Sequence, residues 1–177
     1  MNLCGEAMSF GGTVEREEFA QLKNFGLREK DSYGRLITAR LRHIEPDLMA
    51  KADYMVGIAK KYFDPYAYFI VHDINLGEHS EDSFHYSGEA IDGHFKKLTL
   101  AQMFYCAQLA GFKGIGAYGC DAWDNPGIHA DVREQVHQLV WYGWEDEVWD
   151  AKLQETVPTL VYEYNRKDVF EYINDAC

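Results

Sequence analysis

The sequence predicts a single domain of the α+β class, because stretches with helical spacing and stretches with strand composition alternate without a repeat or a low-complexity linker. The 177 residues are 47% hydrophobic and 15% aromatic, which is the composition of a folded globular protein. Residues 1–34 contain many glycines and only a weak period, with one short helix expected over residues 14–24. We therefore expect an N-terminal arm over residues 1–34 and one domain over residues 35–177.

The first helix predicted within the domain begins at Pro46, because a proline fits the first turn of a helix and Asp47 places an acidic side chain there. Apolar residues then recur at spacings of three and four and predict a face that packs on the core: Leu48, Ala52, Met55, Val56, Ala59 and Tyr62. Residues 67–72 are aromatic and β-branched, which is typical of a strand. A loop over residues 73–78 is expected to follow.

A second helix is predicted to begin at Thr99, because Thr99 and Gln102 form a capping-box pattern, and to end at Gly111. Its core-facing residues are expected to be Leu100, Met103, Phe104, Ala107 and Leu109. Residues 114–119 then read G-x-G-x-x-G. This match follows a helix and leads into a loop over residues 120–126, so it predicts a strand and not a dinucleotide-binding turn.

The last part of the chain is aromatic and then acidic. Residues 140–144 are dense in aromatic side chains, which cover a core or line a groove for carbohydrate or peptide, and residues 145–150 are acidic. Residues 154–174 carry apolar side chains at helical spacing. They predict a C-terminal helical extension of the domain.

Charge and hydropathy exclude several partners. The net charge is −12 and no basic stripe is present, which argues against nucleic acid or an anionic membrane surface. No apolar run is long enough for a membrane span, and residues 1–6 lack the features of a secretory signal, so we expect synthesis in the cytoplasm. The four scattered cysteines, Cys4, Cys106, Cys120 and Cys177, are expected to be free thiols.

His85, Asp92 and His129 offer two imidazoles and one carboxylate. Such a set leaves one position of a tetrahedral Zn²⁺ open for water, as catalytic zinc sites do. Gly88 tolerates the backbone angles of a turn, which would place His85 on a bend. After Gly88, side chains alternate as in a strand, which puts Asp92 on the same face as the small residues Gly88 and Ala90. Residues 128–133 alternate in the same way, which puts His129 on a polar strand face. We therefore predict that these faces meet at one ion.

Isolated histidines and aspartates are more often structural than metal-binding, so the surrounding residues carry the prediction. The first motif has Ser83, His85, Gly88, Ala90 and Asp92 at its fixed positions, and the second reads His129, Asp131 and Arg133. Together they resemble the zinc D-Ala-D-Ala carboxypeptidase family, whose relatives include phage L-alanyl-D-glutamate endolysins and the hedgehog signalling domain. The resemblance covers roughly residues 45–145. It implies a small antiparallel sheet that carries one zinc ion, bound by His85, Asp92 and His129, and that is flanked by helices.

The resemblance also implies hydrolysis of peptidoglycan stem peptides, but the chain departs from the family in two places. Pro126 stands where relatives commonly carry a general acid/base glutamate, so Asp124 is the expected proton shuttle; Asp121 and Asp131 are the other nearby carboxylates that could take this catalytic role. Asp131 is expected to orient a ligand histidine. Residues 72–75 stand where relatives carry an arginine that holds the substrate carboxylate.

Arg133 is the nearby arginine that would replace it, or it forms a structural ion pair with an acid; with Ser83 it is expected to contact the substrate. Two functions remain open at this point. The first is a zinc metallopeptidase of phage or bacterial type, an endopeptidase in preference to a D,D-carboxypeptidase, that acts at the cell wall after release or as a virion component. The second is an inactive zinc-binding structural or binding module, for example in a virion. A water-filled fourth position would favour the enzyme, and a fourth protein ligand the module. The sequence leaves the oligomeric state open.

Overall fold

The computed structural model describes residues 23–25, 44–74, 79–150 and 152–175. The expected arm and its short helix therefore lie largely outside the described residues. Within the part that is described, Phe25 is buried in the core, and the carboxylate of Asp53 accepts hydrogen bonds from the backbone of Asn24 and Phe25. Asn24 and Phe25 thus lie against helix α2 (Pro46–Tyr62), which carries Asp53.

Six strands form one mixed sheet in the order β1-β2-β4-β3-β5-β6, and the protein is of the α+β class as predicted. The strands are β1 (Phe69–Asp73), β2 (Ala90–Phe95), β3 (Gly114–Tyr118), β4 (Gly127–Asp131), β5 (Leu139–Asp150) and β6 (Glu155–Glu163). Neighbouring strands are antiparallel except for β3 and β5, which are parallel.

The expectation of a purely antiparallel sheet is therefore wrong at one pair, and chain connectivity gives the reason. Strand β4 lies between β2 and β3 and ends with Asp131 beside Gly114, where β3 begins. A short loop then carries the chain past this end, and the backbone N–H of Leu139 donates to the carbonyl of Lys113 at 2.7 Å. Strand β5 thus joins the free edge of β3 from the same end and runs in the same direction.

Both predicted helices begin where their caps indicated. Pro46 opens α2, and the capping box of Thr99 and Gln102 opens α3 (Leu100–Ala110), which ends at Gly111 with φ +82° in the left-handed region. Tyr62 and Leu109, which were expected on the core faces, are instead 59% and 45% exposed. Each lies near the C-terminal end of its helix.

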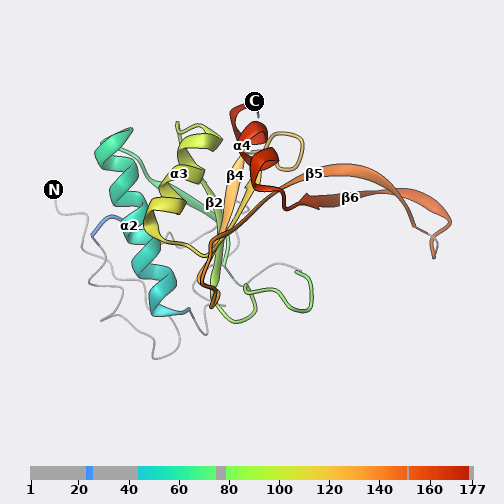
Figure 1. Cartoon of the computed structure of the whole chain (residues 1–177), viewed down its shortest axis with the longest axis horizontal. Coiled ribbons are helices and arrows are strands. Elements are labelled where there is room, and N and C mark those ends of the chain that lie inside the picture. Colours follow the sequence, from blue (N-terminus) through green and yellow to red (C-terminus); the bar gives the residue numbers. More distant parts are fainter. Residues whose placement is uncertain (1–22, 26–43, 75–78, 151, 176–177) are drawn as a thin grey trace.

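The two faces of the sheet differ in chemistry. Alternate residues of the strands form one apolar core with helices α2, α3 and α4 (Arg166–Asp175): Ile91, Phe95, Ile115, Ala117, Ile128, Ala130 and Val140. Figure 1 shows the helices gathered on this side of the sheet. The intervening residues lie on the opposite face, which is where the polar side chains of β2 and β4 lie.

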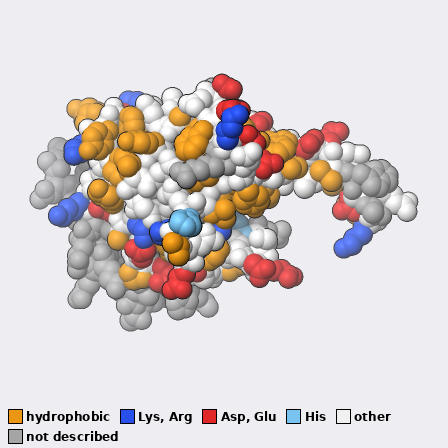
Figure 2. All heavy atoms as spheres, in the orientation of Figure 1, with side chains coloured by type: hydrophobic (Ala, Val, Ile, Leu, Met, Phe, Trp, Pro, Cys, Tyr) orange, Lys and Arg blue, Asp and Glu red, His pale blue; other side chains and the backbone are white. Residues whose placement is uncertain are grey.

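The C-terminal part is a strand followed by a helix, so the expectation of helical spacing over residues 154–174 holds only for α4. Residues 156–161 are mostly β-branched, which favours the strand β6 over a helix. Pro158 is tolerated because β6 is an edge strand. The β5–β6 hairpin extends well beyond the body of the molecule (Figure 1), and acidic side chains follow its length (Figure 2). No helix in the described segments is long and apolar enough to cross a membrane.

The cysteines do not all behave as expected. Cys106 is a free and fully buried thiol on α3. Cys120, by contrast, is disulfide-bonded, so the expectation of four free thiols is wrong here. Sequence spacing does not reveal which cysteines a fold brings within bonding distance.

Candidate metal centre

The structure brings His85, Asp92 and His129 together. Asp92 Oδ1 lies 3.2 Å from His85 Nε2 and 2.8 Å from His129 Nδ1, and the two ring nitrogens are 3.1 Å apart. Ligands of a tetrahedral zinc ion, at about 2.0–2.2 Å from the metal, lie about 3.3–3.6 Å from one another. The triangle of donor atoms is therefore close to the size that one divalent ion requires.

Local structure explains this meeting. Asp92 on β2 and His129 on β4 are direct cross-strand partners, so the sheet register sets their separation. His85 lies in a turn in which Gly88 N–H donates to the His85 carbonyl at 3.1 Å, and Gly88 adopts φ +73°, which favours glycine. The Ser83 hydroxyl accepts a hydrogen bond from His85 N at 3.3 Å and holds the start of that turn.

Each ligand histidine is oriented through its other ring nitrogen. His85 Nδ1 donates to the backbone carbonyl of Ile74 at 2.7 Å, which leaves Nε2 free to bind a metal. His129 Nε2 donates to Asp131 at 3.0 Å, which leaves Nδ1 facing Asp92. Asp131 is fully buried and also accepts two hydrogen bonds from the Arg133 guanidinium. Its position is that of a carboxylate that fixes a metal-bound histidine.

The charges of these groups depend on one another. Burial alone would raise the pKa of Asp92, but the charges and hydrogen bonds of His85 and His129 outweigh it and hold that pKa well below its ordinary value. Burial would lower the pKa of His129, yet Asp92 and Asp131 raise it to about 9. Burial also opposes ionisation of Asp131, and hydrogen bonds from Arg133 and His129 lower its pKa to about 2. A proton on His129, or a metal ion in its place, would therefore balance the charge of the two carboxylates.

The G-x-G-x-x-G stretch has a structural role at this site. Gly114 lies opposite Asp131 on β4, and a Cβ at Gly114 would lie 2.2 Å from a carboxylate oxygen of Asp131. A Cβ at Gly116 would lie 2.6 Å from the Trp141 indole. The glycines of β3 thus provide the space for a buried carboxylate and an indole, and the strand predicted for residues 114–119 is confirmed as β3, Gly114–Tyr118.

A cavity of about 590 Å³ opens over the ligand set. Its walls are mostly aromatic and include Phe84, Tyr118, Trp123, Trp141, Tyr162 and Tyr164. Trp123 stacks on Tyr118 with ring centroids 4.2 Å apart. Along β5 the aromatic residues divide between two tasks, because Trp141 faces the cavity whereas Tyr142 stacks on Tyr172 of α4. Alternate positions of this segment therefore line the cavity and pack against a helix.

The other predicted site residues lie at different depths. Ser83 and Arg133 line the cavity, and the Arg133 guanidinium lies 4.6 Å from the centroid of the Phe84 ring. Asp124 is exposed in the loop between β3 and β4 and does not line the cavity. The structure therefore does not bring Asp124 to the metal centre, because this loop turns Trp123 inward instead.

Three further polar residues line the cavity, His79, Ser80 and Asp82, and the sequence analysis missed them. Among the described residues, two carboxylates line the cavity: Asp92 of the donor set, and Asp82. His79 stacks on His85 with ring centroids 4.0 Å apart and an interplanar angle of 4°. The available signal was their closeness to Ser83, where the first motif begins.

The donor set suits more than one metal. Two imidazoles and a carboxylate bind Zn²⁺ in hydrolases and Fe²⁺ in oxygenases, so geometry establishes a possible metal centre and not the identity of the ion. In the described residues no fourth His, Cys, Asp or Glu completes this set. Comparison with models of protein families, with curated proteins and with solved structures found no significant match for this chain.

Proposed function

We propose that this protein is a zinc-dependent peptidase that hydrolyses peptidoglycan stem peptides. The observation that carries the proposal is the three-residue donor set, which opens into an aromatic cavity. Each of its histidines is held by a hydrogen bond from the ring nitrogen that does not face the other donors. Structural zinc sites are usually closed by a fourth protein ligand, and catalytic sites leave that position to water or substrate. The substrate class rests on the resemblance of the two motifs to the zinc D-Ala-D-Ala carboxypeptidase family.

His85, Asp92 and His129 would hold the ion, and Asp131 would keep His129 in the tautomer that presents Nδ1. A bound Zn²⁺ supplies a water of lowered pKa and polarises the scissile carbonyl. Trp123 and Trp141 flank the cavity and would restrict access of bulk water to the reacting peptide.

Proton transfer to the leaving amine needs a further group, and Asp82 is the better candidate than Asp124 because it lines the cavity. We expect Asp82→Asn to lower the turnover number by about 10²–10⁴-fold while zinc stays bound. Asp124→Asn is the matched control and is expected to keep turnover near that of the unmodified protein. The reverse result, with activity lost only in the Asp124 variant, would show that the loop between β3 and β4 closes over the site during catalysis.

Attack within a stem peptide fits the site better than attack at a free C-terminus. Arg133 is the arginine that lines the cavity, and it already pairs with Asp131 and lies against Phe84. A carboxylate-binding site normally presents an unengaged bidentate guanidinium. We therefore expect an endopeptidase.

Digestion of purified peptidoglycan, followed by mass analysis of the fragments, tests the proposal. Internal cleavage that disappears with a chelator and returns with Zn²⁺ is the expected result. Release of free D-Ala alone would make the protein a carboxypeptidase. The absence of any zinc-dependent product from several types of cell wall would favour a non-catalytic zinc module, the alternative that Pro126 at the usual acid/base position supports.

A further inference from the structure

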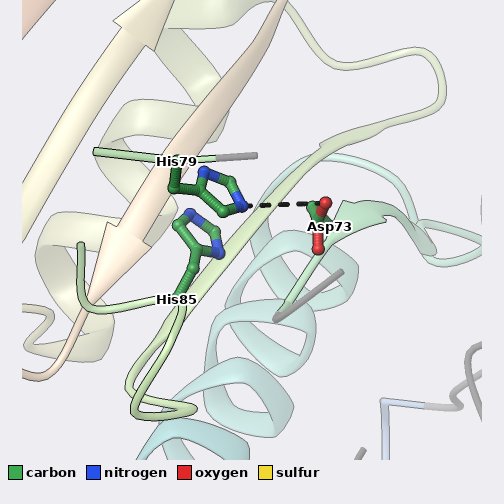
Figure 3. Close-up of side chains that lie close together, drawn as sticks. All are labelled: Asp73, His79 and His85. Atoms are coloured by element: carbon green, nitrogen blue, oxygen red, sulfur yellow. Dashed lines mark ion pairs between the residues drawn. The ribbon is translucent and has the colours of Figure 1, made fainter. Parts of the chain in front are cut away.

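A second group of possible ligands lies on the other side of His85. Asp73, His79 and His85 each offer one donor atom, and these atoms lie within 4.8 Å of one another. Figure 3 shows the His79 ring parallel to the His85 ring, with one edge toward Asp73. Asp73 ends β1, and His79 precedes the turn that carries His85.

The His79 ring is held in an unsatisfied position. Its Nε2 is buried and has no hydrogen-bond partner in the part of the chain that the structure describes. The nearest carboxylate oxygen, Asp73 Oδ2, lies 3.7 Å away, which is too far for a hydrogen bond. A buried donor or acceptor without a partner costs about 1–3 kcal/mol. One small cation at about 2.0–2.2 Å from each atom would bridge this separation and give His79 Nε2 a partner.

The backbone favours this placement of the carboxylate. Between Val71 and Asp73 the register of β1 against β2 shifts, so that Asp73 comes to lie opposite Asp92. Bulges of this kind re-aim side chains and occur often beside functional sites. The Asp73 side chain is 9% exposed and the His79 side chain 17%, so both are largely shielded from bulk water.

His85 does not complete this second set. Its Nε2 faces Asp92 and His129, and its Nδ1 is bonded to the Ile74 carbonyl. Its ring instead packs flat on His79 and fixes the plane of that imidazole. Two protein ligands therefore remain, His79 Nε2 and Asp73 Oδ2, with water for the other positions.

We propose that Asp73 and His79 bind a second divalent cation beside the centre formed by His85, Asp92 and His129. A mixed nitrogen and oxygen donor pair suits Zn²⁺ or Co²⁺ better than Ca²⁺ or Mg²⁺. With two protein ligands in place of three, the second position binds more weakly than the first. This inference does not depend on peptidase activity, because a non-catalytic zinc module would hold the same two ions.

Calorimetric titration of the chelator-stripped full chain with Zn²⁺ tests the proposal without any turnover assay. The unmodified protein is expected to bind two ions, the second at least about tenfold more weakly, since it lacks a third protein ligand. His79→Gln and Asp73→Asn are each expected to abolish the second step and to leave the affinity of the first within about threefold. His137→Gln, at an exposed histidine, is the matched control and is expected to keep both steps.

The outcomes separate clearly once circular dichroism shows that each variant is folded. A single binding step in the unmodified protein would overturn the proposal, as would a second step that persists in both variants. Loss of the second binding step in His137→Gln would also overturn it, because the second ion would then bind at the surface. If His79→Gln or Asp73→Asn removed the first binding step instead, these residues would belong to the first centre, and the proposal of a separate second ion would be wrong.

Discussion

The two faces of the central sheet are made by the same strands but are stabilised in different ways. Ile91 and Ile128 point into the core beneath the helices, whereas their neighbours Asp92 and His129 point to the metal centre. The core face is closed by α2, α3 and α4 (Figure 1) and depends on packing. The opposite face is open to a cavity and depends on hydrogen bonds and charge.

This difference shows how stability and function are divided between the faces. Removing apolar volume from the core face affects the free energy of unfolding but no donor atom. Moving a carboxylate on the opposite face is expected to affect metal binding at the candidate centre but to change little apolar packing. The following predictions test that division, from the largest expected effect to the smallest.

The largest effect on stability is expected from Phe104→Ala, because Phe104 is fully buried on α3. Loss of this ring should lower the free energy of unfolding by about 3–5 kcal/mol, in part through the cavity that it leaves. Denaturant titration measures this change. Zinc affinity of the folded variant should be unaltered, and a large loss of affinity at full folding would show that the two faces are coupled.

Gly114→Ala is expected to act on the other face. The added methyl group would displace Asp131 and so remove the partner of His129 Nε2. Loss of such an outer partner typically lowers metal affinity by about 10–100-fold. Calorimetric titration with Zn²⁺ measures the change.

Gly57→Ala is the matched control for that substitution. Gly57 lies on α2, and the atoms nearest to its added methyl group would belong to the side chain of Asn24, the first at 3.0 Å. We expect zinc affinity within about twofold of the original, since no group of the centre moves. Equal losses in both glycine variants would mean that the affinity reports on overall stability and not on Asp131.

The smallest effect is expected at Cys106 on the core face. Burial raises the pKa of its thiol to about 12, so at pH 8 the group is almost wholly protonated, and the thiolate is the reactive form. Iodoacetamide should therefore leave Cys106 unmodified in the native protein and modify it after denaturation, as peptide mass analysis would show. Rapid native alkylation would indicate that α3 opens readily.

Much of this division could be predicted from the sequence. Alternation along residues 90–92 and 128–131 identified both faces, and the capping box at Thr99 identified the start of α3. Apolar periodicity and caps are local properties, so they survive in a single sequence.

Other features depend on contacts between distant segments and were not predictable. The parallel pairing of β3 with β5 follows from the place of β4 in the sheet. Strand β6, by contrast, was mistaken for helix although its β-branched residues 156–161 favour a strand. Asp124 was expected to be the proton shuttle because it lies in the loop that leads to His129, and Asp82 was overlooked, although the fold turns Asp124 to solvent. Sequence distance along a loop does not determine which side chain enters a cavity.

Elemental analysis of the purified protein after gel filtration, repeated on His85→Ala and His129→Ala, tests the central claim most directly. The folded protein is expected to retain about one tightly bound zinc ion per chain, as one such donor set implies, and each variant is expected to lose it. His94→Ala is the control on the same face of β2, two residues beyond Asp92, and is expected to retain the ion. Retention of zinc in both His85→Ala and His129→Ala, or a tightly bound metal other than zinc in the unmodified protein, would contradict the account.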